Sequence, residues 1–472
     1  MDFEKIKAIV AGTDGLTGWC LRRRETQSTT LIHLPGIYKV EAGKFARQRN
    51  PHPREVITAP SEEIWVTVYC HPRRDMTGMS DIPDRVPSAT GEAVGQFVSD
   101  DEAAVKETLA GLVAAALAQP NRPYPLVDKS AVFPQVDLAE RELLELSQPA
   151  LQARLQRFAD AVLPASESEL GIELSNLEVF VRRMRNHVET GTGIIIDYPS
   201  TLTDAELCFI ARFGDKVAEH TSRPHARRLR DLDPQVLVTI GADYARGTAN
   251  ASAPPQWAGP VVLTGTAAHD FMKLDYQPLS WHCGGRAIYE KMSRYAKGRP
   301  AWGQKSLAGD AVTIFSDPLV PFGPDSHLES DAQPARRTCL LKDGCYDEVI
   351  GGPRYYHYLG LLEQDMTPSG PPGNTVVPAG RHRTCDLLGT GRAVVIRGFS
   401  DFRADPTSGD FASEIRLGEV REDGNAKPFK GGLLIGNWFD ALADIRLSSE
   451  TVGQDGYYGP AAIRVGDLKV AS

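Results

Sequence analysis

The chain has 472 residues, of which 42% are hydrophobic and 24% are charged, and its formal net charge at pH 7 is −9. One hydrophobic core rarely serves a chain of this length, so two domains are expected. The acidic balance argues against nucleic acid as the main partner, because phosphate backbones are bound by basic surfaces. No stretch approaches the roughly 18 to 20 apolar residues that a membrane-spanning helix needs.

The cysteines and the start of the chain indicate a cellular location. Seven cysteines are an odd number spread over the whole sequence, which does not suggest a disulfide framework. Reduced thiols in a reducing compartment are the simplest interpretation. The first residues lack the basic and apolar regions of a signal peptide. We therefore expect a cytoplasmic protein that has neither nucleic acid nor a membrane as a partner.

Strand and helix signals alternate in the first part of the chain. Residues 17–24 and 29–33 predict a hairpin, and residues 64–70 predict a strand because β-branched and aromatic side chains dominate them. Residues 101–118 predict a helix that begins with acidic side chains, as the helix dipole favours.

The same alternation continues to about residue 232. A helix is expected over residues 138–162, with a break at Pro149. Residues 174–184 and 193–197 predict two strands around a turn near Asn186. We expect these strands and helices to pack as a sheet with helices on it.

The chain divides near residue 232. Asp233 and Pro234 predict the start of a helix, with Asp233 as the N-cap, and a loop rich in small residues follows that helix. The predicted fold class is α+β. A mixed N-terminal sheet with helices spans residues 1–232, and a β-rich domain with a few helices, one of them over 279–295, spans 233–472.

The C-terminal half carries several motifs whose order and spacing are specific. They are LAGDAVTIFSDP at 307–318, LESDAQPARRTCLL at 328–341, SGDF at 408–411, GGLLIGNWFDAL at 431–442 and YGPAAIRV at 458–465. Together they resemble the TldD/PmbA family, and the last three resemble its TldE (PmbA) branch. One departure is that Glu329-Ser330-Asp331 replaces the Asp-Glu-Gly that is usual in the family.

The resemblance implies that two chains form the enzyme and that only one of them binds the metal. In the TldD branch, a helix with the motif His-Glu-x-x-x-His binds zinc, and its glutamate polarises the attacking water. If His282 occupies the place of the second histidine, Gln277 and Pro278 occupy the places of the first histidine and the glutamate. The expected cofactor is therefore zinc held by a TldD-like partner, and no metal ligand or catalytic residue is expected in this chain.

The function implied by the resemblance is that of a non-metal subunit in a heterodimeric metallopeptidase. The pair would hydrolyse short or unfolded peptides, or peptide-derived amides, and this chain alone would be inactive. His282 and Arg336 are the candidate residues of a substrate groove.

Three other interpretations remain open at this point. Cys283 could serve as the nucleophile of a self-contained hydrolase, although nucleophilic cysteines need an activating base nearby. His282, Cys283, Cys339 and Cys345 could form an atypical zinc site, but they lack the usual ligand spacing. The chain could also be a non-enzymatic binding subunit in the maturation of peptide natural products. The basic residues at 223–230 are interpreted as a solvated strand face.

Overall fold

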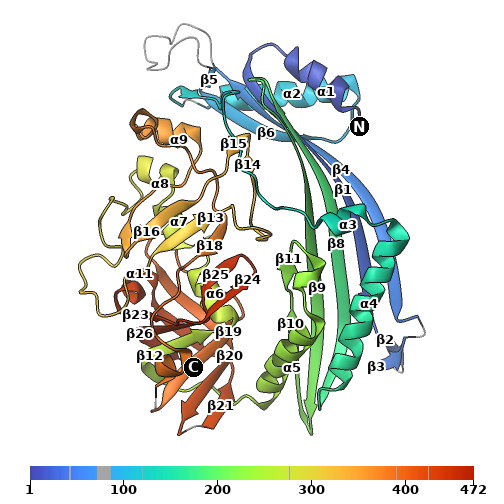
Figure 1. Ribbon diagram of the computed structural model, residues 1–472, viewed down its shortest axis with the longest axis vertical. Coiled ribbons are helices and arrows are strands. Elements are labelled where there is room, and N and C mark those ends of the chain that lie inside the picture. The colour runs from blue at the N-terminus through green and yellow to red at the C-terminus, as the bar shows by residue number, and fades with distance from the viewer. Residues whose placement is uncertain are drawn as a thin grey trace.

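The computed structural model describes residues 1–41, 44–50, 52–71, 87–119, 121–275, 277–389, 391–423 and 425–471. A long, curved antiparallel sheet forms one side of the molecule and a β-rich C-terminal half forms the other (Figure 1). Both halves contain strands and helices, which confirms the α+β fold class. Within the described residues, none of the helices combines the length and the apolar character needed to cross a membrane.

The N-terminal sheet is built from very long strands in the order β10-β9-β8-β1-β4-β6. Their bounds are β1 (Leu16–His33), β4 (Arg54–Cys70), β6 (Gly91–Phe97), β8 (Ile172–Thr190), β9 (Ile195–Phe213) and β10 (Lys216–Ser222). Short strands accompany them: β2 (Gly36–Glu41), β3 (Lys44–Arg49), β5 (Ser88–Ala89), β7 (Tyr124–Pro125) and β11 (His225–Ala226).

Two turns predicted in this sheet were wrong. The segment expected as a hairpin over 17–33 is one unbroken strand, because β4 on one side and β8 on the other pair with it along nearly its whole length. Asn186 lies inside β8, opposite Tyr198 of β9, and the chain turns later, where Gly193 adopts a positive φ of 91°. Strands of this length exceed the usual five or six residues, so local signals favoured an earlier turn.

Five helices cover one face of the sheet. They are α1 (Phe3–Ala11), α2 (Glu102–Leu117), α3 (Arg141–Glu145), α4 (Gln148–Glu167) and α5 (Pro234–Asn250). The helix predicted over 101–118 is confirmed as α2, and the Asp101 carboxylate caps it by accepting hydrogen bonds from the backbone N–H groups of Ala103 and Ala104. The predicted break is also confirmed, because Pro149 lies in the first turn of α4 and a new helix begins there.

Helix α5 packs with the N-terminal half. Asp233 caps it as predicted, and Val238 and Ala245 belong to the same hydrophobic cluster as Val179 of β8 and Leu207 of β9. The side chains of Asp243 and Tyr244 in the same helix also bind Arg397 of the C-terminal half, so the domain boundary at 232/233 stays a prediction.

The C-terminal half contains two sheets around one hydrophobic cluster. The first contains β12 (Trp257–Thr264), β19 (Ala393–Phe399), β20 (Asp410–Glu422), β21 (Asn425–Phe429), β22 (Leu433–Asn437), β23 (Ile445–Leu447) and β26 (Ala462–Ala471). The second contains β13 (Ile314–Asp317), β16 (Thr338–Lys342), β17 (Cys345–Tyr346), β18 (Asn374–Val376), β24 (Thr451–Gln454) and β25 (Tyr457–Pro460). A small hairpin of β14 (Glu329–Ser330) and β15 (Gln333–Pro334) projects toward the N-terminal sheet (Figure 1).

The helices of this half are short. They are α6 (Thr266–Met272), α7 (Pro278–His282), α8 (Gly285–Tyr289), α9 (Pro353–Tyr358), α10 (Thr384–Leu388) and α11 (Trp438–Ala441). The single helix predicted over 279–295 was wrong, because Gly284 separates α7 from α8 and the helix ends at Tyr289. Gly285 is required at the junction, since a Cβ there would lie 2.8 Å from the Cβ of Tyr355.

Candidate functional site

His282 is a buried histidine at the end of α7. Its side chain is held on both ring nitrogens: Nε2 lies 3.0 Å from the carbonyl oxygen of Thr407, and Nδ1 accepts the backbone N–H of Arg294 at 3.1 Å. The ring packs edge-to-face on Phe439, and burial lowers the pKa of the imidazole. The residue is 1% exposed, so in this conformation it fastens α7 to neighbouring loops, and its groove role stays a prediction.

The two positions before His282 in the expected metal motif do not fit a zinc ion. Gln277 is buried, and its Nε2 donates to the carbonyl oxygen of Phe402 at 3.3 Å. Pro278 opens α7 and has no donor atom in its side chain. Throughout the described parts of the chain, no group of three or more His, Cys, Asp or Glu side chains is arranged to hold a metal.

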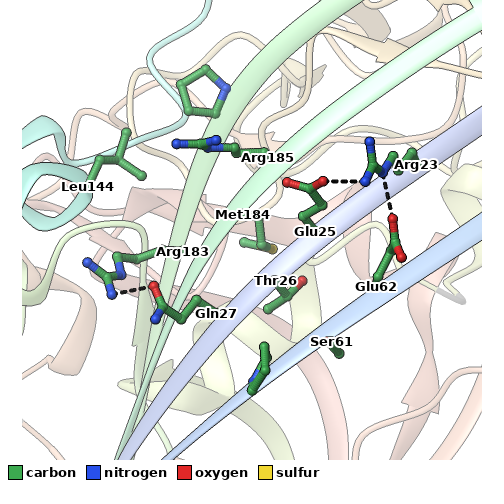
Figure 2. Close-up of a pocket in the computed structure, with 12 residues that line it drawn as sticks. Arg23, Glu25, Thr26, Gln27, Ser61, Glu62, Leu144, Arg183, Met184 and Arg185 are labelled. Carbon is green, nitrogen blue, oxygen red and sulfur yellow. Dashed lines mark hydrogen bonds and ion pairs between the residues drawn. The ribbon is translucent and has the colours of Figure 1, made fainter. Parts of the chain in front are cut away.

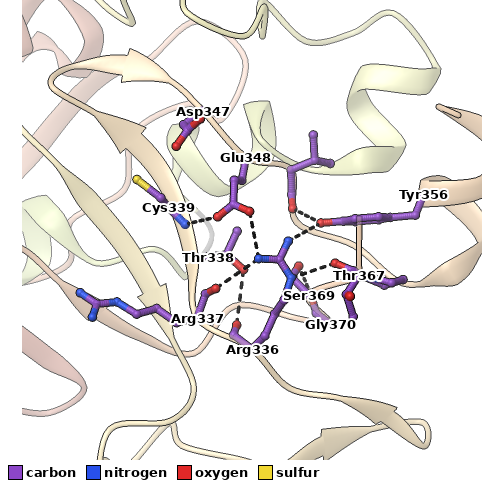
Figure 3. A network of polar contacts seen from close by, with 12 residues as sticks. Arg336, Arg337, Thr338, Cys339, Asp347, Glu348, Tyr356, Thr367, Ser369 and Gly370 are labelled. Carbon is purple, nitrogen blue, oxygen red and sulfur yellow. Dashed lines mark hydrogen bonds and ion pairs between the residues drawn. The ribbon is translucent and has the colours of Figure 1, made fainter. Parts of the chain in front are cut away.

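Arg336 lies at the centre of a polar network (Figure 3). Its guanidinium donates to Glu348 Oε1 at 3.0 Å, to the Tyr356 hydroxyl at 3.1 Å and to the carbonyl oxygen of Thr367 at 2.8 Å. Glu348 in turn accepts the backbone N–H of Cys339. The network joins β16 to α9 and to the loop after it. A contact between Arg336 and substrate stays a prediction.

The thiol of Cys283 does not fit the role of a nucleophile. It is 0% exposed, and burial raises its pKa far above the ordinary value. Its Sγ donates to the carbonyl oxygen of Leu340, which lies 3.8 Å away. A reactive cysteine needs a thiolate and access to solvent, and this residue has neither.

Thiol labelling tests this assignment. We expect iodoacetamide to modify the exposed Cys385 in the native protein and to reach Cys283 only after unfolding. Peptide mapping by mass spectrometry, with a Cys385→Ser variant as the control, measures the order of labelling. Rapid modification of Cys283 in the folded chain would restore the cysteine-hydrolase interpretation.

Glu329 connects the two halves of the molecule. Its buried carboxylate accepts two hydrogen bonds from the Arg22 guanidinium, at 3.1 and 2.9 Å, and one from the Tyr198 hydroxyl at 3.1 Å. The backbone N–H of Ala332 donates to it at 3.1 Å. Arg22 and Tyr198 project from β1 and β9, on the face of the sheet opposite the helices. The sequence drew attention to Glu329 only as a departure from the family motif.

A cavity of about 360 Å³ lies beside this ion pair, between the two halves. The N-terminal half lines it with aromatic and acidic side chains: Trp19, Tyr69, Glu92 and Tyr124. The C-terminal half contributes Asp331 at the tip of the β14–β15 hairpin, a glycine-rich turn, and Arg354 with Tyr355 of α9. Aromatic walls with charges of both signs suit a peptide, so this cavity is the best candidate for a substrate-binding surface.

A larger cavity, of about 830 Å³, lies elsewhere (Figure 2). It opens on the helix-bearing face of the N-terminal sheet and points away from the C-terminal half. Its charged groups are largely paired: Arg23 binds Glu25 and Glu62, each at 2.7 Å, and Arg183 donates to Gln27. Because these side chains are paired with one another, little charge is left to recognise a ligand. This cavity is therefore a weaker candidate for substrate binding than the cavity between the halves.

The basic segment 223–230 does not form the solvated strand face that was predicted. Arg227 donates to the carbonyl oxygens of Gly323 at 2.9 Å and Pro324 at 3.0 Å, and Arg228 lies over the ring of Phe322. The segment therefore fixes a loop of the C-terminal half onto β9 and β11. The prediction was wrong because these partners are distant in sequence.

Comparisons with known proteins agree with this architecture. Residues 258–472 match the family model described as PmbA/TldA metallopeptidase C-terminal domain. No curated protein sequence matches the chain. Solved structures, however, share its fold over nearly the whole length.

Three such structures illustrate the similarity. A proposed modulator of a DNA gyrase from Thermotoga maritima is 16% identical, with a TM-score of 0.73, and the match covers 99% of this chain and 100% of that one. TldE from Thermococcus kodakarensis is 16% identical, with a TM-score of 0.71 and 99% coverage of each chain. A proposed gyrase modulator from Bacteroides thetaiotaomicron is 11% identical, with a TM-score of 0.73 and coverage of 99% and 98%. The C-terminal domain of this chain, residues 258–472, therefore belongs to the PmbA/TldA metallopeptidase family, and the whole chain shares the fold of these structures.

Proposed function

We propose that this chain is the metal-free, TldE-like subunit of a heterodimeric metallopeptidase. The observation that carries the proposal is the chemistry of α7. Where the zinc-binding branch of the family needs two imidazoles and a carboxylate, this chain has Gln277, Pro278 and His282. Both nitrogens of His282 are already bound within the fold, so the side chain has no lone pair free for a metal.

The partner in this proposal is a TldD-like chain that carries the His-Glu-x-x-x-His motif and holds the zinc. The likeness in fold to a protein named TldE supports the assignment of this chain to the other subunit. The cavity between the halves would then form part of the surface that binds the substrate, which is a short or unfolded peptide or a peptide-derived amide. A cytoplasmic location and a role in peptide maturation belong to the proposal and rest on sequence resemblance.

The self-contained hydrolase is not part of this proposal. Its nucleophile would be Cys283, and that thiol is buried and protonated. A zinc site built from His282 and the cysteines also lacks support, because His282 Nε2 and Cys283 Sγ face backbone carbonyl groups and His282 Nδ1 accepts a backbone N–H.

Affinity purification from the native organism tests the proposal. We expect the tagged chain to retain a protein with the His-Glu-x-x-x-His motif, and the pair to cleave short peptides until a chelator removes the metal. A pair in which the motif glutamate of the partner is replaced by glutamine serves as the inactive control, since that change keeps the subunits together. Chelator-resistant cleavage by the pair, or cleavage by this chain alone, would contradict the proposal.

A further inference from the structure

A third cavity, of about 480 Å³, lies on the C-terminal half, away from the contacts between the halves. It occupies the face of the β19-β12-β26-β23 region on which α10 packs. Val262 and Leu387 form a small hydrophobic cluster there and give the cavity an apolar floor. Its size is in the range of small-molecule sites in proteins.

Arg464 is the unusual residue in this cavity. It is half-buried on β26, and none of the described residues gives its guanidinium a hydrogen bond or a carboxylate. The strand register places it directly opposite Arg446 of β23. Like charges at directly opposed positions of neighbouring strands destabilise a sheet, so this pair would be favoured by a bound counter-ion.

Two further arginines surround Arg464, and neither neutralises it. Arg446 is held at the rim by Asp444 Oδ1 at 2.7 Å and by the carbonyl oxygen of Ala308. Arg392 lies over the ring of Trp257, with its Cζ 5.8 Å from the ring centre. Trp257 is itself fixed by a hydrogen bond from its Nε1 to a backbone carbonyl.

Among the described residues that line the cavity, the carboxylate is that of Asp386, and it is already paired with an arginine. Asp386 accepts two hydrogen bonds from Arg383, at 2.8 and 3.0 Å. His382, which also lines the cavity, lies 3.4 Å from Asp310 outside it. The cavity therefore concentrates positive charge in a chain whose net charge is −9.

We propose that this cavity binds a small organic anion through a phosphate or carboxylate group held by Arg464. The planar guanidinium fork matches both groups in a bidentate manner, and Arg446 and Arg392 add charge from either side. The ring of Trp257 and the apolar floor would contact a flat hydrocarbon part of the same ligand. The proposal does not depend on peptidase activity.

Isothermal titration of the purified full chain tests the proposal, with phenyl phosphate and benzoate as separate probes at fixed ionic strength. We expect one site for at least one probe, and the stronger probe identifies the anionic group. Arg464→Gln should weaken binding about tenfold or more, because it removes a charge-assisted pair of hydrogen bonds. Arg464→Lys should give an intermediate affinity.

The matched control is Arg403→Gln, which removes an exposed arginine paired with Asp401 elsewhere on the surface. It should leave binding unchanged. Without the anion, Arg464→Gln should unfold at or above the melting temperature of the parent chain, because one of two opposed charges is gone. The absence of binding for both probes, or equal losses in the Arg464 and Arg403 variants, would overturn the proposal.

Discussion

Replacing Arg22 with alanine is expected to lower the free energy of unfolding by about 3 to 5 kcal/mol. The side chain of Glu329 is 0% exposed and that of Arg22 is 26% exposed, so the change leaves a buried carboxylate without its cationic partner. The Tyr198 hydroxyl and the backbone N–H of Ala332 cannot compensate for a full charge. Urea unfolding followed by fluorescence measures the loss.

Two variants separate this effect from a general loss of packing. Arg24→Ala removes a neighbouring arginine from the same face of β1, where it is exposed and donates to Asn186, and should cost well under about 1 kcal/mol. Adding Glu329→Gln to Arg22→Ala should recover part of the stability, because it removes the unpaired charge. Equal losses of unfolding free energy in Arg22→Ala and Arg24→Ala would show that the Arg22–Glu329 ion pair does not hold the two halves together.

Acidification from pH 6.5 to about 4 is expected to destabilise the chain through His220, by up to about 3 kcal/mol. Burial, together with Arg416 and Arg397, lowers the pKa of this histidine to about 4. The ring stacks on Tyr244 of α5, with the ring centres 4.8 Å apart. Because the unfolded chain takes up the proton first, the stabilisation is present above the unfolded pKa and is lost as the pH falls toward the folded pKa.

The comparison of wild type with His220→Gln over this pH range measures the contribution. The variant should show a shallower decline in stability, whereas His52→Gln, which changes an exposed histidine, should follow the wild type. The stability of the variant must be subtracted from that of the wild type at each pH, because His225 has the opposite effect on stability. Hydrogen bonding to Asp455 raises the pKa of His225, so the stabilisation that it contributes is lost as the pH rises. Parallel profiles for wild type and His220→Gln would contradict the assignment.

Features set by local chemistry could be predicted from the sequence. Asp101 and Asp233 each cap a helix because a short carboxylate accepts the free N–H groups of the first turn. Asn437, at the end of β22, caps α11 in the same way through its side-chain oxygen.

Features set by distant partners could not be predicted. Nothing within residues 17–33 shows that strands on both sides will hold this segment straight. Arg22 and Glu329 are 307 positions apart, so their pairing has no local signal. The same holds for Arg227, whose charge suggested a solvated face while its partners are carbonyl groups of a loop about a hundred residues later.

The central claim is that this chain cannot hold the catalytic metal by itself. The most direct measurement is elemental analysis of the isolated chain after incubation with Zn²⁺ and removal of unbound metal. The account predicts far less than one zinc per chain, and no chelator-sensitive peptide cleavage. One zinc per isolated chain, together with chelator-sensitive cleavage, would contradict it.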